Sequence, residues 1–407
     1  MSPRVVLVTG VSRYLGGRLA GVLAADPSID RVIGVDTVAP RPEQAALLGR
    51  TEFVRADIRN PLIAKVIAQA GVDTVVHMNV IATPLGAGGR TAMKEINVIG
   101  TMQLLAACQK APTMRKLIVK STTAVYGTSP RDPALFTEDV EPRSLPKSGY
   151  AKDAVEVEGY VRGFGRRRPD VSLSLLRFTN FIGPAIETPL TRYLGLPLVP
   201  TVLGFDPRVQ LCHEDDGIEA LRRASVEDHP GIYNVGGEGV LLLSQALRRL
   251  GRPSLPVPSP AVSIVARAFR SAGVVDFSPE QMRYLQHGRV ADVRRLARGF
   301  GWSPRSTSEA FDDFVQASAT SPVPAAAVHA EQLALAVLAR WMPAARGGGS
   351  TASLTSLAPT TLAPTTSAPA RPGGTVRAGA PALVGAPSAG PSAGAPSVGP
   401  SAAGPRG

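Results

Sequence analysis

The sequence predicts an α/β protein in which helices cover both faces of a doubly wound parallel sheet. Short apolar runs alternate with amphipathic helical patterns through the first half of the chain, as is typical of parallel sheets. After residue 183 proline and glycine become frequent and the alternation weakens. We therefore expect a sheet domain over 1–183, a smaller substrate-binding region over 184–316, a linker with a possible helix over 317–346 and a disordered tail over 347–407.

The expected elements follow one another in strand–helix order. Six buried runs are expected to be strands: Val5–Val8, Val32–Val35, Glu52–Arg55, Thr74–His77, Lys116–Lys120 and Leu173–Leu176. Four segments between them are expected to be helices: Gly16–Ala25, Ile63–Gly71, Lys94–Gln109 and Ala151–Arg166. In the smaller region, Gly231–Val235 and Arg289–Leu296 are expected to return to the sheet or its edge.

The end of the chain differs in composition from the rest. Val328–Trp341 has the pattern of one amphipathic helix. From Gly347 the chain is dominated by Ala, Pro, Ser, Thr and Gly and contains no acidic residue. Such a segment cannot bury enough apolar area to offset the entropy of ordering it, so we expect it to be disordered.

The overall composition is that of a globular protein, with 407 residues, 44% hydrophobic residues and a net charge of +12. The tightest basic run, Arg166–Arg168, ends a helical pattern and has no interleaved aromatic residues, so nucleic-acid binding is not expected. Two distant cysteines, Cys108 and Cys212, give neither a disulfide framework nor a metal-ligand spacing. We expect a cytoplasmic protein without a membrane span, because the N-terminal apolar run is too short for a signal peptide and no apolar stretch reaches about 18 residues.

A glycine-rich turn follows the first expected strand and begins the first expected helix. Gly10 allows the tight turn, Gly16 permits close packing of helix against strand, and the free N–H groups of the helix start suit a pyrophosphate. Tyr14 and Leu15 lie in the same turn. The second expected strand ends at Asp36, where a carboxylate would bind a ribose 2′-hydroxyl and repel a 2′-phosphate. The pattern predicts a Rossmann domain that binds NAD rather than NADP.

Two further positions near the turn bear on the cofactor. Asp57 and Ile58 follow the third expected strand and are expected to contact the adenine edge. Arg13 stands where a middle glycine would let the backbone approach the pyrophosphate. Two alternatives stay open here: the arginine side chain turns outward and pairs with phosphate, or the cofactor lies less closely against the turn.

Eight successive motifs carry a family resemblance. In chain order they are Val8-Thr9-Gly10 with Gly16, Asp36, Asp57-Ile58, Asp73-Thr74-Val75-Val76-His77, Asn97-Val98-Ile99-Gly100-Thr101, Ser121-Thr122-Thr123-Ala124-Val125-Tyr126-Gly127, Arg177-Phe178-Thr179-Asn180-Phe181-Ile182-Gly183-Pro184 and Tyr233-Asn234-Val235-Gly236. Over residues 3–316 the chain resembles the extended short-chain dehydrogenase/reductase family, the NAD-dependent epimerase/dehydratases, and is similar to actinobacterial UDP-glucose 4-epimerase-like proteins. The resemblance implies NAD as cofactor and a nucleotide sugar as substrate.

The resemblance also implies roles for single residues. Thr122 occupies the position of a Ser or Thr that hydrogen-bonds the reacting sugar hydroxyl, and Asn97 occupies a position on the cofactor side. Asn180 falls at a substrate-binding position, and Arg208 lies one residue from that of an arginine that binds the substrate diphosphate. In this family a tyrosine acts as general base, and a lysine four residues later lowers its pKa and binds the nicotinamide ribose.

The catalytic motif departs from the family pattern of Tyr-x-x-x-Lys. If Tyr150 is the base, the lysine position falls on Ala154; if Lys152 is the lysine, the tyrosine position falls on Ser148. Residues two apart on a helix face different ways, so Tyr150 and Lys152 converge only if the helix begins near Lys152 and Gly149 keeps the tyrosine on a loop. On that condition we predict Tyr150 and Lys152 as a displaced catalytic pair. Otherwise Tyr150 is a packing residue and Lys152 a solvated one.

Other residues near the predicted site have structural interpretations. Tyr126 is a second candidate base, although its position is normally structural in the family. His77 and His213 fall at strand ends, and no carboxylate–histidine ligand spacing surrounds them, so structural roles are favoured and no metal is expected. The segment Met78-Asn79-Val80 is bulkier than the small pair that the family has on the nicotinamide side.

Two hypotheses follow from these features. The first is an NAD-dependent nucleotide-sugar epimerase, dehydratase or reductase that transfers hydride at a sugar carbon. The second is an NAD-binding sensor or scaffold that has lost proton transfer, which Arg13 and the broken tyrosine–lysine spacing favour. The resemblance further implies a homodimer, formed through the helices Lys94–Gln109 and Ala151–Arg166.

Overall fold

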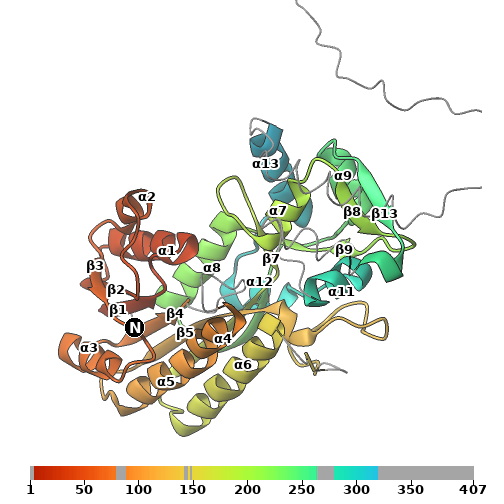
Figure 1. The fold of residues 1–407 in the computed structure, drawn as a ribbon. Helices are drawn as coiled ribbons and strands as arrows, with labels where there is room; N and C mark the ends of the chain where they lie inside the picture. The colour runs from red at the N-terminus through yellow and green to blue at the C-terminus, as the bar shows by residue number, and fades with distance from the viewer. Residues whose placement is uncertain are drawn as a thin grey trace, which may run out of the picture. The chain divides into compact units, whose positions relative to one another are not determined.

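The computed structural model describes residues 4–78, 89–141, 145–146, 149–262, 264 and 279–319 (Figure 1). Several predictions concern residues outside these ranges: the segment Asn79-Val80, Ser148, the possible helix Val328–Trp341 and the tail from Gly347. Among the described residues, no helix combines the length and the apolar character needed to cross a membrane.

The centre of the fold is a seven-stranded sheet in which each neighbouring pair of strands runs parallel. In spatial order the strands are β11 (Gly231–Val235), β6 (Ser172–Phe178), β5 (Lys116–Thr122), β4 (Thr74–His77), β1 (Val5–Thr9), β2 (Arg31–Asp36) and β3 (Glu52–Arg55). The strand order reverses between β1 and β4, and ligands of open parallel sheets bind beyond the carboxyl ends of the strands at such a point. The predicted doubly wound α/β class is confirmed.

Helices cover both faces of this sheet, and each face has its own apolar core. Helices α1 (Tyr14–Ala25) and α8 (Glu214–Val226) cover one face, and α3 (Leu62–Ala70), α5 (Gly100–Lys110) and α6 (Gly149–Arg167) cover the other (Figure 1). Neighbouring residues of β5 divide between the two cores, with Ile118 on the α1 face and Val119 on the α6 face. Because side chains alternate along a strand, Lys120 belongs to the α1 face.

The expected helix Lys94–Gln109 is one helical run with an irregular middle. It consists of α4 (Gly89–Lys94), a π-helical turn (Glu95–Ile99) and α5. Such turns often occur at functional sites. On the expected helix Ala151–Arg166 the structure corrects a condition set by the sequence: α6 begins at Gly149, not near Lys152. Tyr150 is therefore on the helix and not on a preceding loop.

The region after β6 builds a separate apolar core from short strand pairs and helices, with members between Ile182 and Phe314. The pairs are β7 (Asn180–Ile182) with β10 (Leu211–His213), β8 (Val199–Val202) with β13 (Ser254–Val257), and β9 (Arg208–Val209) with β12 (Leu241–Leu242). The helices of this region are α7 (Pro189–Leu194), α9 (Leu243–Arg249), α11 (Pro279–His287), α12 (Arg294–Phe300) and α13 (Thr307–Ala319). A short helix α2 (Pro42–Ala45) follows β2.

Arg289–Leu296, which is expected to return to the sheet or its edge, adds no strand to the sheet but lies at the edge, where Asn234 of the edge strand β11 donates to the carbonyl oxygen of Asp292. Within it, Ala291 forms a single bridge with Phe136, and α12 begins at Arg294. The reason is the turn before it: a Cβ at Gly288 would lie 2.4 Å from the carbonyl oxygen of Arg208. The segment thus passes directly over β9 and brings Arg289 toward the carboxyl end of β5 instead of extending the sheet.

Candidate active site

The glycine turn forms a cradle for a phosphate group at the point where the strand order reverses. Gly10 has a φ of 76°, and its N–H donates to the carbonyl oxygen of Val35 at 2.8 Å. A Cβ at Gly16 would lie 2.1 Å from the carbonyl oxygen of Gly10, so only glycine lets α1 begin this close to the turn. Arg13, the N-cap residue, makes no side-chain cap, which leaves N–H groups of the first turn available to an anion. These residues fit a dinucleotide phosphate.

Asp36 ends β2 directly beside this turn. Its carboxylate accepts the N–H of Ser12 at 3.1 Å and the N–H of Thr37 at 2.7 Å. A carboxylate has about four acceptor positions, so these two bonds fix its orientation and leave capacity for a ribose hydroxyl. The position that the sequence predicted for NAD recognition is thus built into the turn.

Asp57 and Ile58 lie beside the same crevice but are engaged differently. Arg59 binds the Asp57 carboxylate at 2.7 Å, and these hydrogen bonds hold the pKa of Asp57 below its usual value. Ile58 is buried against the start of α5, where a Cβ at Gly100 would lie 2.8 Å from its side chain. The structure leaves Ile58 as the apolar contact and gives the Asp57 carboxylate an internal partner.

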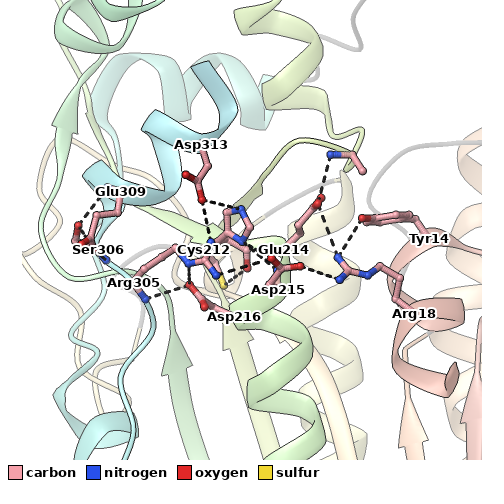
Figure 2. A network of polar contacts seen from close by, with 12 residues as sticks. Tyr14, Arg18, Cys212, Glu214, Asp215, Asp216, Arg305, Ser306, Glu309 and Asp313 are labelled. Carbon is pink, nitrogen blue, oxygen red and sulfur yellow. Dashed lines mark hydrogen bonds and ion pairs between the residues drawn. The ribbon is translucent and has the colours of Figure 1, made fainter. Parts of the chain in front are cut away.

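Tyr14 and Leu15 begin α1 and tie the turn to the rest of the protein. Leu15 packs against the apolar core of the α1 face. Arg18 donates to the Tyr14 hydroxyl at 3.1 Å and to Asp215 of α8 at 2.8 Å. Figure 2 shows this contact continuing to Arg305, whose guanidinium lies 3.1 Å from Asp216.

This network, which we call the α1–α8–α13 network, joins three helices by charge. Arg305 also lies 2.9 Å from Asp313 of α13, and 3.8 Å from Asp215 (Figure 2). The carboxylates of the first turn of α8 also suit the positive end of that helix. The network fixes α1, and with it the glycine turn, against the smaller region.

Thr122 and Tyr150 are brought together at the carboxyl end of β5. Thr122 ends the strand and accepts the N–H of Ala124 at 3.2 Å, while Tyr150 stands in the first turn of α6. Burial raises the pKa of Tyr150 to about 12, and a side-chain hydrogen bond with Thr122 opposes that rise. Thr122 and the hydroxyl of Tyr150 are thus neighbours at this end of β5.

Lys152 lies apart from this pair. Its ammonium group is 3.8 Å from Glu156, one turn further along α6, and its side chain is 45% exposed. With Tyr150 on the helix, two residues before it, the two side chains face different ways, as the sequence argument anticipated for that case.

The cation that acts on Tyr150 is Arg289, which the sequence analysis did not single out. Its positive charge opposes the rise in the pKa of Tyr150. The guanidinium donates to the Gly127 carbonyl at 2.8 Å and lies over the ring of Tyr284, 5.4 Å from its centroid. Its Nε is buried and has no hydrogen-bond partner among the described residues. Arg289 is far from Tyr150 in sequence and belongs to no local motif, so no sequence pattern could have identified it.

Asn180 and Tyr284 complete this side of the site, whereas Arg208 stands apart. Tyr284 is buried beside Asn180, and burial raises the pKa of its hydroxyl to about 12. Arg208, on β9, forms no side-chain hydrogen bond or ion pair with any described residue. The structure thus groups Asn180 with Tyr284 and Arg289 and leaves the predicted role of Arg208 a prediction.

Asn97 sits in the π-helical turn between α4 and α5. Its amide donates to Asp153 of α6 at 3.4 Å, and its carbonyl oxygen accepts the Thr101 hydroxyl at 2.5 Å. Arg90 binds the same Asp153 carboxylate at 2.6 Å and donates to the carbonyl of Gly149. These contacts connect Asn97 and Arg90 to the start of α6, and the predicted role of Asn97 on the cofactor side stays a prediction.

Tyr126 is fully engaged in structure. Its hydroxyl donates to Asn234 at 2.8 Å and accepts from Arg177 at 2.9 Å. Arg177 in turn forms a buried ion pair with Glu158 of α6 at 2.7 Å. This arrangement fits the structural interpretation of Tyr126.

The two histidines at strand ends have internal partners. His77 hydrogen-bonds with Thr9 and Thr101, both at 2.9 Å, and burial lowers its pKa to about 4, so it is neutral. His213 caps α8 by accepting the N–H of Asp215 at 3.2 Å. Both contacts suit structural roles.

Comparison with known proteins identifies the family. The model of the NAD dependent epimerase/dehydratase family matches residues 6–236. The chain belongs to this family. The predicted family is therefore confirmed, and so is NAD as the cofactor. The glycine turn and Asp36 are the features of this chain that fit the cofactor of the NAD dependent epimerase/dehydratase family.

Relatives of this family member give the breadth of the likeness. An uncharacterised protein of Mycobacterium tuberculosis is 49% identical over 322 residues, which are 79% of this chain and 86% of the relative. Among solved structures, dTDP-glucose 4,6-dehydratase of Bacillus anthracis, in complex with NAD, has a TM-score of 0.59 at 18% identity and covers 78% of this chain and 97% of its own. UDP-glucose 4-epimerase of Thermotoga maritima, with UDP-glucose, has a TM-score of 0.58 at 19% identity and covers 77% of this chain and 98% of its own. These structures support the shared fold.

Proposed function

We propose that the chain is an NAD-dependent enzyme that transfers hydride at a carbon of a nucleotide sugar, as epimerases and dehydratases of this family do. The observation that carries the proposal is the contact of Thr122 with Tyr150, under the charge of Arg289, next to a fitting NAD cradle. The likeness to a dTDP-sugar dehydratase and a UDP-sugar epimerase supports the substrate class.

Tyr150, Thr122 and Arg289 each have a separate role in the proposed oxidation of a sugar alcohol. Such a reaction removes a hydride from carbon and a proton from its hydroxyl, and NAD supplies the hydride acceptor when bound. The oxygen of Tyr150 takes the proton, while Thr122 hydrogen-bonds the reacting hydroxyl and fixes its position. Arg289 stabilises the phenolate form of Tyr150 that accepts the proton. Arg289 thus does in this chain what the family lysine does elsewhere.

The raised pKa of Tyr150 favours a second candidate function. With a pKa of about 12, the phenol stays protonated at neutral pH, and Lys152 is engaged with Glu156. An NAD-binding sensor or scaffold that has lost proton transfer would show these properties. The two candidates differ in whether any sugar is converted.

Turnover on a panel of nucleotide sugars separates the two functions. The full chain is incubated with NAD and a series of UDP- and dTDP-hexoses, and products are identified by NMR. We expect conversion of at least one sugar, with a rate that rises toward alkaline pH as Tyr150 ionises. Tight NAD binding without conversion of any sugar at neutral or alkaline pH would favour the sensor.

We also propose that the protein is a homodimer through α5 and α6. Met102 of α5 and Tyr160 of α6 are large apolar side chains that are 40% and 39% exposed, and Ile99, in the π-helical turn before α5, is 45% exposed. Exposed large apolar side chains on neighbouring helices are compatible with an interface. Light scattering should give twice the chain mass for the wild type and a lower mass for Met102→Glu.

A further inference from the structure

Two cations, Arg13 and Lys120, lie near the carboxyl ends of β1 and β5, where the cofactor crevice is expected. Arg13 ends the glycine turn after β1, and Lys120 lies near the end of β5. Val8 pairs with Val76 and Val76 with Ile118, so Lys120 is level with Gly10 with one strand between them. Two strand spacings place their backbones roughly 10 Å apart.

Lys120 belongs to the face of the sheet that α1 covers, and Arg13 is the N-cap residue of α1 on that face. Val11, two residues before Arg13, and Ile118, two residues before Lys120, pack in one apolar core with α1. The alternation along β5 therefore directs Lys120 to the face that carries the glycine turn. A lysine or arginine side chain is long enough for the two charged ends to share one ligand.

Neither side chain has a partner within the described part of the chain. Arg13 and Lys120 are half-buried, yet neither forms a side-chain hydrogen bond or an ion pair with a described residue. Asp36 acts on Arg13 only through its charge, and its carboxylate accepts the N–H groups of Ser12 and Thr37. Neighbouring Arg18, by contrast, is paired.

Two partly buried cations close to each other raise the free energy of the folded protein as long as no anion is bound between them. Desolvated cations need partners, and two of them near each other also repel. Burial, followed by the charge of Arg13, lowers the pKa of Lys120 to about 8. Burial likewise lowers the pKa of Arg13. An anion held between them would relieve both effects.

We propose that the side chains of Arg13 and Lys120 together bind the diphosphate of NAD. The diphosphate is the doubly charged part of the family cofactor and belongs at the glycine turn that the two cations flank. Arg13 would then replace the close backbone approach that a glycine at its position allows. The proposal rests on the cofactor of the proposed function and not on its reaction, so it holds whether or not a sugar is converted.

Calorimetric titration of the full chain with NAD tests this assignment. Arg13→Gln and Lys120→Met should each weaken NAD binding about tenfold or more, since each removes a charge-assisted hydrogen bond. Lys120→Arg keeps the charge and should restore most of the affinity. Arg31→Gln is the matched control, because Arg31 is an exposed cation at the opposite end of β2 and pairs with Glu52.

The pH dependence of NAD affinity gives an independent readout. Lys120 is protonated below its pKa of about 8 and loses its charge above it, so wild-type affinity should be constant below about pH 8 and fall as the pH rises above it. Lys120→Met should remove that fall. The other charged groups that act on this position are Arg13 of the turn, which stays charged, and His77 of β4, which burial keeps neutral with a pKa of about 4.

Two results would overturn the proposal. One is NAD affinity within about twofold of wild type in both Arg13→Gln and Lys120→Met, with unchanged melting curves. The other is an equal loss of affinity for adenosine, measured by competition, because adenosine carries no phosphate. If Arg13→Gln fails to fold, the comparison of Lys120→Met with Lys120→Arg decides the question alone.

Discussion

Cations in two regions of this protein differ in how they are paired. In the α1–α8–α13 network, Arg18 and Arg305 meet carboxylates at 2.8 and 2.9 Å (Figure 2). Around the cofactor turn and the Thr122–Tyr150 pair, Arg13, Lys120 and Arg289 form no ion pair with any residue that the structure describes. Paired cations hold the framework, and cations without an ion pair mark where a ligand or a developing charge belongs.

The largest expected effect comes from comparing two tyrosines, one beside a cation without an ion pair and one beside a paired cation. Tyr150 lies under the charge of Arg289, whereas Tyr126 is held by the paired Arg177. Tyr150→Phe should reduce turnover by roughly 10²–10⁴-fold, the usual contribution of a general base, and leave NAD affinity unchanged. Steady-state kinetics with the sugar found in the panel checks this.

Tyr126→Phe is the matched control for that variant. Its hydroxyl bonds Asn234 and Arg177 in the interior, so its loss should lower stability by about 1–3 kcal/mol and leave the turnover number close to wild type. If Tyr126→Phe loses turnover and Tyr150→Phe does not, the roles are reversed and Tyr126 is the base.

Removing the carboxylate partner of a buried cation should lower the free energy of unfolding. Glu158→Ala leaves Arg177 buried without its carboxylate, because both side chains are almost fully buried. Breaking a buried ion pair from one side costs about 3–5 kcal/mol, which urea unfolding of the full chain would measure. A loss no larger than that of an exposed pair such as Arg31→Gln would show that the pair contributes little.

A smaller effect, a shift of the pH–rate profile, should distinguish the role of Arg289 from that of Lys152. Arg289→Met removes the charge that opposes the rise in the pKa of Tyr150, so the alkaline limb of the pH–rate profile should move to higher pH, with a fall in turnover at neutral pH of about tenfold for each pKa unit. Lys152→Met, which removes a half-exposed cation bound to Glu156, should leave the profile in place. A shifted profile in Lys152→Met alone would restore the lysine to the role it has in the family.

The fold was accessible from the sequence because its signals are local. Apolar runs, the turn from Gly10 to Gly16 and the acid at Asp36 each need only neighbouring residues, and the strands and the cofactor followed from them. Thr122 and Tyr150 were predicted as site residues from motif positions. Arg289 could not be found this way, because the turn at Gly288 over β9 carries it to the site.

Lys120 shows the same limit in a different form. Its place in a strand is visible in the sequence, but the absence of a partner depends on which residues lie opposite in three dimensions. The catalytic register also needed the structure, because the start of α6 at Gly149 decided whether Tyr150 and Lys152 could converge.

Thermal unfolding of Arg18→Met and Lys120→Met, both without NAD, tests the central comparison most directly. Each variant replaces one cation of the α1 face with the same apolar side chain. Arg18→Met should lower the stability, because it removes the cation 3.8 Å from the buried Glu214 and the cation 2.8 Å from Asp215. Lys120→Met should leave the stability unchanged or raise it, because it removes a desolvated charge without a partner among the described residues. Equal destabilisation by both would contradict the account.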